Sequence, residues 1–273
     1  MEIIVNTNPL IRKFLRIHYM SSPREPTKNL FKFADFFTPN FYRAAQISDM
    51  IYGQDRRGVE SALLLSLLDR NISRDDEYSK DFKDLLESID IQSITTSTEL
   101  VEAAKNKLIE DYAKFSNAIS TWIEKIFGFK LPDRLDVILD MSPWFGQGVF
   151  ISDDPPLVAV SIEKYETRDI GVLLHETLHY LMRRNGMREK MQGIDPVFEE
   201  TLMDYFCPYG MLDEKIGILG HEIDIEGHSK QQILLRPLSA QLSKKMLPLM
   251  EEYYRICGNE TIWDFLRKKG FDL

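Results

Sequence analysis

Apolar residues recur every three or four positions along two stretches of the chain, which is the spacing of a helix with one buried face. The longer stretch is Thr96–Phe127, where Thr96 and Glu99 match a capping box. The shorter stretch is Thr167–Asn185. The pattern therefore predicts two amphipathic helices, and the first of them is the longest expected in the chain.

The shorter stretch has clear signals at both ends. Thr167 is expected to cap its start, and Asp169 suits the first turn because the N-terminal end of a helix dipole is positive. Gly186 follows as the residue that ends the helix. One continuous apolar face lies between these signals, formed by Ile170, Leu173, Leu174, Thr177, Leu178 and Leu181.

Short segments rich in valine and isoleucine lie between the two helices, bounded by proline and glycine as strands commonly are. They are Leu135–Met141, Gln147–Ser152 and Leu157–Glu163, and Glu2–Asn6 is a candidate first strand. A strand at the edge of such a sheet can pair with an extended peptide. Gln147–Ser152 and Leu157–Glu163 are both candidates for that edge.

These elements predict an α+β fold with three regions. Residues 1–95 are expected to form a mainly helical N-terminal region, whose aromatic segment 31–43 we interpret as core packing. Residues 96–208 hold the two helices and the strands. Residues 209–273 are expected to be helical, with breaks at Pro237 and Pro248, and to complete a cleft.

The shorter helix contains His175-Glu176-Thr177-Leu178-His179, the pattern H-E-x-x-H. On a helix the two histidines are one turn apart on the same face, so both rings can bind one tetrahedral Zn²⁺. Glu176 stands beside them and can take a proton from a metal-activated water. The alternative interpretation is two surface histidines on an amphipathic helix.

A zinc site of this kind requires a third ligand from the protein. The continuation H-E-x-x-H-x-x-G-x-x-H is absent, because Met182 and Asn185 stand where glycine and histidine are needed. A later helix offers glutamate instead. Asp195 and Pro196 are strong signals for its start, as N-cap and first helical residue.

Three acidic residues follow on this later helix, Glu199, Glu200 and Asp204. Glu200 and Asp204 are four residues apart and therefore share one face. Glu200 can bind the metal, while Asp204 can accept the free ring N–H of a ligand histidine. Glu199 is the competing ligand, and we prefer Glu200 because only it has an acidic partner one turn later.

The combination H-E-x-x-H followed by E-x-x-x-D resembles the gluzincin metallopeptidases, the thermolysin-like branch of the zincins. The resemblance covers residues 97–208, and many members have glycine where this chain has Thr201. It implies a zincin-like core with a long backing helix, a small mixed sheet, the H-E-x-x-H helix and a third-ligand helix. It also implies a zinc-dependent peptidase that acts on peptides or proteins. The matching residues are His175, Glu176, His179, Glu200 and Asp204.

Zinc peptidases commonly need a second donor, histidine or tyrosine, to stabilise the oxyanion of the tetrahedral intermediate. We rank His228 and Tyr253 first among the candidates, which also include His221, Tyr209 and Tyr254. Two other functions use the same residues. One is a metal-binding or partner-binding protein without turnover, and the other is a zinc hydrolase of a non-peptide amide or ester.

Composition and charge indicate which partners, which location and which cysteine chemistry to expect. The chain has 273 residues and a net charge of −9, which argues against a nucleic-acid surface. It lacks a signal-peptide layout and an apolar run of about 18 residues, so we expect a cytoplasmic protein that does not act at a membrane. Cys207 and Cys257 are too few for a disulfide framework. We interpret Cys207 as a small buried residue, with lining of the metal site as the alternative.

Overall fold

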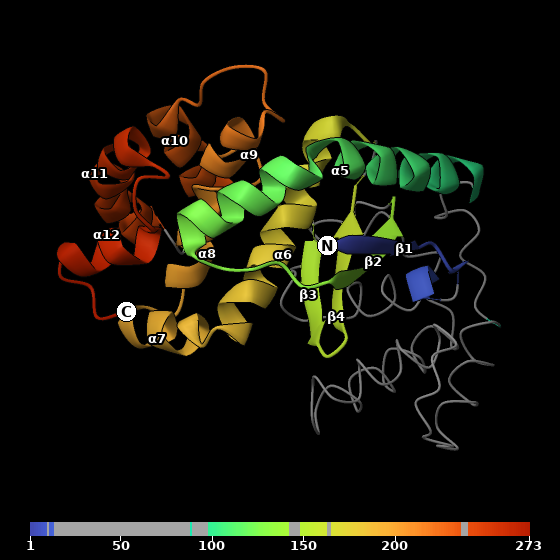
Figure 1. Ribbon diagram of the computed structural model, residues 1–273, viewed down its shortest axis with the longest axis horizontal. Coiled ribbons are helices and arrows are strands. Elements are labelled where there is room, and N and C mark those ends of the chain that lie inside the picture. The colour runs from blue at the N-terminus through green and yellow to red at the C-terminus, as the bar shows by residue number, and fades with distance from the viewer. Residues whose placement is uncertain (10, 14–87, 89–97, 142–147, 163–164, 236–239) are drawn as a thin grey trace. The chain divides into compact units, whose positions relative to one another are not determined.

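The computed structural model describes residues 1–9, 11–13, 88, 98–141, 148–162, 165–235 and 240–273, which form an α+β fold (Figure 1). The chain divides into two compact units. The first comprises Met1–Ile3, Asn106–Leu135 and Tyr165–Leu273, and the second comprises Ile4–Lys105 and Asp136–Lys164. Most of the expected N-terminal region, residues 1–95, lies outside the described residues, as does the whole aromatic segment 31–43.

A four-stranded mixed sheet, most of whose residues belong to the second unit, has the strand order β1-β2-β4-β3. The parallel pair β2/β4 places Val137 opposite Val158, and β3 and β4 form an antiparallel hairpin. The strands predicted from the sequence are confirmed, with ends shifted by at most two residues. Their bounds are β1 Glu2–Asn6, β2 Arg134–Asp140, β3 Gly148–Asp153 and β4 Pro156–Ser161.

The order of the strands decides which of the two candidate segments lies at an edge. β4 is paired on both sides and almost completely buried, whereas β3 is the last strand in the order. Gly148–Asp153 is therefore the edge strand of the two. A buried ion pair lies at the last residue of β2, where Arg12 Nε donates to Asp140 Oδ1 at 2.9 Å.

The first unit consists mainly of helices, and α6, α7 and α8 contact one another within it (Figure 1). The long helix α5 ends at Phe127 as predicted, while Thr96 of the expected capping box lies outside the described residues. The helices are α5 Thr98–Phe127, α6 Ile170–Arg184, α7 Met187–Ile194, α8 Phe198–Asp204, α9 Met211–Ile216, α10 Ile225–Leu235, α11 Ala240–Ile256 and α12 Ile262–Lys268.

The start of α6 differs from the expectation. The hydroxyl of Thr167 donates to Asp111 on α5 at 3.0 Å and does not cap the helix. A capping box between Glu166 and Asp169 takes that place in a short 3-10 turn, where the Glu166 N–H donates to Asp169 Oδ2 at 2.6 Å. The end of α6 agrees with the prediction, because Gly186 adopts a φ of +65°.

Aromatic packing attaches the C-terminal helices to the end of α5. The indole N–H of Trp263 on α12 donates to the Phe127 carbonyl at 2.8 Å. The Phe127 ring lies edge-on to Phe206, with 4.8 Å between their centroids. Because Phe206 follows α8, this contact joins α5 to the chain that supplies the predicted third ligand.

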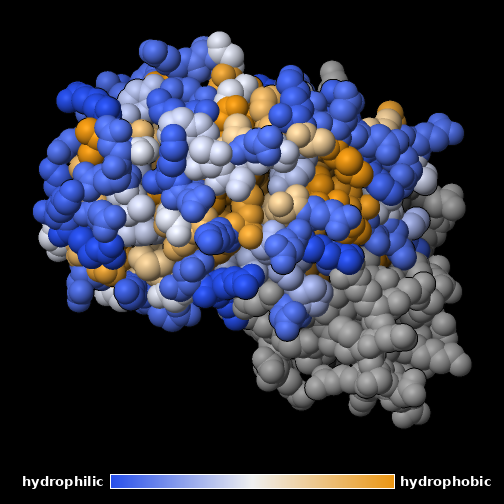
Figure 2. Space-filling model, viewed as in Figure 1, coloured by the Kyte–Doolittle hydropathy of each residue, from blue (hydrophilic) through white to orange (hydrophobic). Residues whose placement is uncertain are grey.

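The predicted break at Pro248 is wrong, because α11 continues through it. Ser243, Met246, Met250 and Tyr253 form a buried stripe along this helix, at spacings of three and four residues. Pro248 lies on the exposed side, where water can satisfy the carbonyl that loses its N–H partner. Figure 2 shows mostly hydrophilic residues on the outer surface of α10, α11 and α12. Among the described residues, no helix combines the length and apolar character needed to cross a membrane.

Asp111 joins α5 to the segment that leads into α6. Its buried carboxylate accepts hydrogen bonds from Lys107, Tyr165 and Thr167, each at 3.0 Å. Burial raises the pKa of Asp111, but these bonds outweigh burial and leave the pKa below its ordinary value of 3.8. The folded state therefore favours the ionised carboxylate.

We expect Asp111→Asn to lower the free energy of unfolding by about 2–4 kcal/mol at pH 7, because charged hydrogen bonds are lost. A carboxylate with a lowered folded pKa stabilises above its unfolded pKa and loses that effect as the pH falls through the folded pKa. Urea denaturation should therefore show a smaller difference between variant and wild type at about pH 3 than at pH 7. Glu110→Gln, at an exposed position on the same helix, is the control. A difference that does not change with pH would contradict this account.

Candidate metal centre

The helix α6 carries both motif histidines at buried or nearly buried positions. Only His179, Arg183 and Arg184 among its residues are not buried. The predicted apolar face is therefore confirmed, and the motif side of the helix is buried as well. A histidine pair in this environment is not the pair of surface histidines that the alternative interpretation required.

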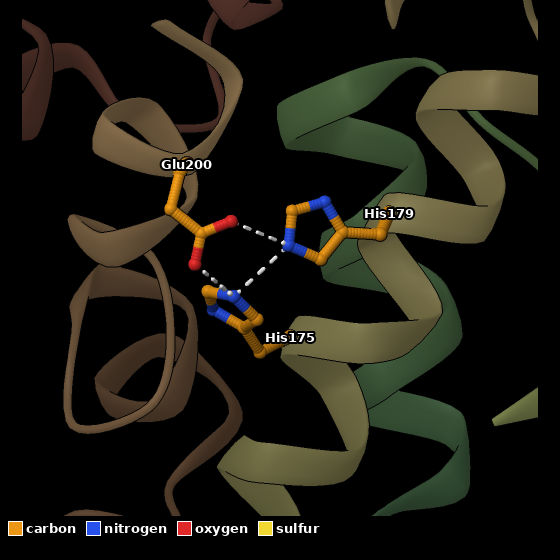
Figure 3. Close-up of side chains that lie close together, drawn as sticks. All are labelled: His175, His179 and Glu200. Atoms are coloured by element: carbon orange, nitrogen blue, oxygen red, sulfur yellow. Dashed lines mark hydrogen bonds and ion pairs between the residues drawn. The ribbon is translucent and has the colours of Figure 1, made fainter. Parts of the chain in front are cut away.

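The side chains of His175, His179 and Glu200 converge on one point (Figure 3). The Nε2 atoms of the two histidines lie 3.1 Å apart. The Glu200 carboxylate oxygens lie 3.3 Å from His175 Nε2 and 3.1 Å from His179 Nε2. Ligand atoms about 2.0–2.1 Å from a tetrahedral Zn²⁺ would lie about 3.3 Å from one another. The three residues predicted as ligands thus form a group that could hold one metal ion.

Acceptors hold the other ring nitrogen of each histidine. His175 Nδ1–H donates to the Cys207 carbonyl at 2.7 Å, and His179 Nδ1–H donates to the Glu199 carboxylate at 2.7 Å. A carbonyl or a carboxylate accepts only, so the hydrogen of each neutral ring is placed on Nδ1. The lone pair of each ring is then on Nε2, where it faces Glu200.

Three acceptors therefore face one another across about 3 Å. Burial lowers the pKa of His175, which favours its neutral ring over an imidazolium that could form an ordinary salt bridge with Glu200. Acceptors this close repel one another unless a cation lies between them. Two imidazole nitrogens and one carboxylate are a donor set suited to Zn²⁺. The residues present therefore fit the metal that the sequence predicts.

The two adjacent glutamates of α8 have different positions. Glu200 points to the Nε2 atoms, and its side chain is 34% exposed, which leaves the group open to solvent on that side. Glu199 is buried and accepts the Nδ1–H of His179, on the side of the ring opposite Nε2. Its second oxygen lies 3.4 Å from Arg188 Nε on α7. The preference for Glu200 over Glu199 as the metal ligand agrees with this geometry.

Asp204 is not the acceptor in the bonds that the structure gives the two rings, because Cys207 and Glu199 take that role. The chain continues past α8 in further turns, which bring the Cys207 carbonyl against His175. Asp204 itself is buried beside them. Burial raises the pKa of Asp204 to about 6, while the charges of both histidines lower it.

The two residues ranked first as oxyanion donors form other hydrogen bonds. His228 Nε2–H donates to the Asp204 carbonyl at 2.5 Å, and burial lowers the pKa of this histidine. The Tyr253 hydroxyl is in the core and donates to the Glu260 carbonyl at 3.0 Å. These contacts give no support to the role that the sequence predicted for the two residues.

Glu176, the predicted general base, differs from His228 and Tyr253 in its hydrogen bonding. It follows His175 directly on α6, and only 6% of the residue is exposed. Among the described residues no hydrogen bond holds its carboxylate, so the oxygens remain available to a water molecule.

Sequence patterns did not predict the contacts that three residues make near the site. Cys207 was a candidate through its thiol, but its main-chain carbonyl makes the contact, and burial raises the pKa of the thiol well above its ordinary value. Arg188 lies on α7, a helix whose pattern was not recognised. Asp213 lies behind the Cys207 turn, as described below. Each acts through a contact that only the folded chain creates.

The hydrogen bond that His179 Nδ1–H donates to Glu199 can be tested by mutation. We expect Glu199→Gln to weaken Zn²⁺ affinity by about 10–100-fold, because an uncharged amide supports the Nδ1–H less strongly than a carboxylate does. Titration calorimetry with Zn²⁺ would measure the change. Glu189→Gln is the matched control, since Glu189 is exposed on α7. Equal affinities of the two variants would contradict the assigned contact.

The geometry stands without support from related proteins. Comparisons with models of known protein families, with curated proteins and with solved structures find no match to this chain. What is known of the site is therefore its own arrangement: two histidines and a glutamate that could hold one metal ion, with a further buried glutamate next to the first histidine.

Proposed function

We propose that the protein is a zinc-dependent peptidase of the gluzincin type. The observation that carries the proposal is the convergence of three acceptor side chains from α6 and α8, with both histidine rings held in the tautomer that presents Nε2. The H-E-x-x-H and E-x-x-x-D patterns support the same conclusion. So do the long helix and the small mixed sheet, which are elements of the zincin-like core.

Zn²⁺ is the metal that we assign. Catalytic zinc sites typically use three protein ligands drawn from histidine and carboxylate, whereas structural sites use four, often cysteine. Among the residues that the structure describes, the ligand group has three members, and Glu200 is partly open to solvent. When bound, Zn²⁺ would polarise a scissile carbonyl and lower the pKa of a water molecule to about 7.

Glu176 is the proposed general base. It follows His175 directly on the same helix, and its charge acts on the pKa of His175, so its carboxylate is near the group. It takes a proton from the attacking water and later delivers that proton to the leaving amine. The carboxylate is not held by another residue of the described chain, which suits a group that must exchange protons with water.

One observation favours a second candidate function, a metal-binding protein without turnover. The two residues ranked first as oxyanion donors are both bonded elsewhere. A site without such a donor would hold metal but hydrolyse poorly. Against this, a purely structural site has no use for a buried glutamate beside its ligands. A hydrolase of a non-peptide amide or ester would use the same residues.

Digestion of a peptide library, with and without a chelator, separates these functions. We expect cleavage that the chelator abolishes and that added Zn²⁺ restores, because Zn²⁺ would polarise the scissile carbonyl and activate the water. A metal-loaded protein that cleaves no peptide but hydrolyses simple amides or esters would favour the non-peptide hydrolase. Bound Zn²⁺ without any hydrolysis would favour the inert protein.

The role of Glu176 has its own test. We expect Glu176→Gln to lower the rate of peptide hydrolysis by about 100–10,000-fold while Zn²⁺ remains bound, because the amide cannot accept the proton. Glu200→Gln is the contrasting variant and should lose Zn²⁺ itself. Metal analysis and a fluorogenic peptide assay on both proteins would separate the two effects. Full activity in Glu176→Gln would rule out the proposed mechanism.

A further inference from the structure

A buried carboxylate lies behind the turn that orients His175. Asp213 is in the first turn of α9, and none of its surface is exposed. Its Oδ2 accepts the main-chain N–H of Tyr209 at 2.5 Å, and the Gly210 N–H also acts to lower the pKa of this carboxyl group. The turn that it holds runs over residues 207–210 and includes the carbonyl to which His175 donates.

This turn needs support from outside its own backbone. Tyr209 has a φ of +64°, a conformation that residues other than glycine rarely adopt. At Gly210 a Cβ would lie 2.5 Å from the Tyr205 carbonyl oxygen, so the chain passes very close to the end of α8. A hydrogen bond from the Tyr209 N–H to a buried carboxylate is the kind of restraint that keeps such a backbone in place.

The same carboxylate packs against the helix that carries the histidines. A Cβ added at Gly171 would lie 2.3 Å from Asp213 Oδ2. Gly171 precedes His175 by four residues, so both lie on the same face of α6. That face therefore meets the 207–213 segment twice, at the Asp213 carboxylate and at the Cys207 carbonyl.

Asp213 occupies its position at a cost in stability. Its Oδ1 has no hydrogen-bond partner among the described residues. Burial raises the pKa of Asp213 to about 8, an effect that the hydrogen bond from the Tyr209 N–H only partly opposes. A packing role alone would be served equally by an apolar side chain of similar size. The cost is consistent with a function beyond packing.

We propose that Asp213 is a positioning residue of the metal centre, which holds the 207–210 turn so that the Cys207 carbonyl fixes the orientation and tautomer of His175. This inference rests on the proposed function, because it assigns the residue to the same metal site. Asp213 acts on the metal through the turn and through His175, in the manner of groups that orient a ligand histidine.

The variant Asp213→Ala removes the acceptor of the Tyr209 N–H. We expect it to weaken Zn²⁺ affinity by about 10–100-fold and to alter the visible absorption spectrum of the Co²⁺-substituted protein. Asp213→Asn keeps one acceptor oxygen for the Tyr209 N–H, so it should restore part of the affinity. Both measurements use the full chain, after circular dichroism has shown that each variant is folded.

A matched control lies one residue further along α9. Glu214 also accepts a main-chain N–H, that of Ile223 at 2.8 Å, and a hydroxyl, that of Tyr254 at 2.7 Å. Its partners lie outside the 207–210 turn. Glu214→Ala should therefore cost stability but leave Zn²⁺ affinity and the Co²⁺ spectrum unchanged.

The outcomes separate this inference from the proposed function. A wild-type chain that binds no Zn²⁺ overturns both. Zn²⁺ binding by the wild type, with the affinity and Co²⁺ spectrum of Asp213→Ala equal to those of Glu214→Ala, overturns the positioning role alone. If Asp213→Ala does not fold, the Co²⁺ spectra of Asp213→Asn and Gly171→Ala test the positioning role instead. Gly171→Ala presses a methyl group against the carboxylate, and a Co²⁺ spectrum unchanged in both variants overturns the inference.

Discussion

Mutual repulsion between three acceptors at one point is the constraint on which the site depends. The Nε2 atoms of His175 and His179 and the carboxylate of Glu200 come within 3.1–3.3 Å of one another. Moving the hydrogen of a neutral ring from Nδ1 to Nε2 would only transfer the conflict, because Nδ1 of each ring faces another acceptor. A cation is the simplest partner for such a group, and the surrounding chain keeps the group assembled.

The protein holds the two histidines in chemically different ways. His175 donates to an uncharged carbonyl in a deeply buried turn, whereas His179 donates to the carboxylate of Glu199. The Glu199 carboxylate also forms an ion pair with Arg188, so the negative charge that supports His179 is partly balanced by a guanidinium. The supports therefore come from α7, from α8 and from the turn before α9, none of which carries the histidines themselves.

Local signals explain why much of the fold could be predicted. The strands between residues 134 and 161 and the helices α5 and α6 follow from hydrophobic period and from glycine at their ends. Where the prediction failed, a tertiary contact outweighed the local preference. Thr167 bonds Asp111 instead of capping α6, and α11 continues through Pro248 because the proline faces solvent. The bond between Thr167 and Asp111 leaves no pattern in neighbouring residues.

For the site, the sequence by itself indicated His175, His179 and Glu200, the three residues that could hold a metal ion, because spacing on a helix fixes which side chains share a face. It also indicated Glu176 as the base. Only the tertiary structure decided which groups hold the rings. A main-chain carbonyl such as that of Cys207 has no residue-type signature, and the partners Arg188 and Asp213 come from separate helices. The roles of Cys207, Arg188 and Asp213 depend on contacts between segments that are brought together only by folding, and no local sequence pattern indicates such contacts.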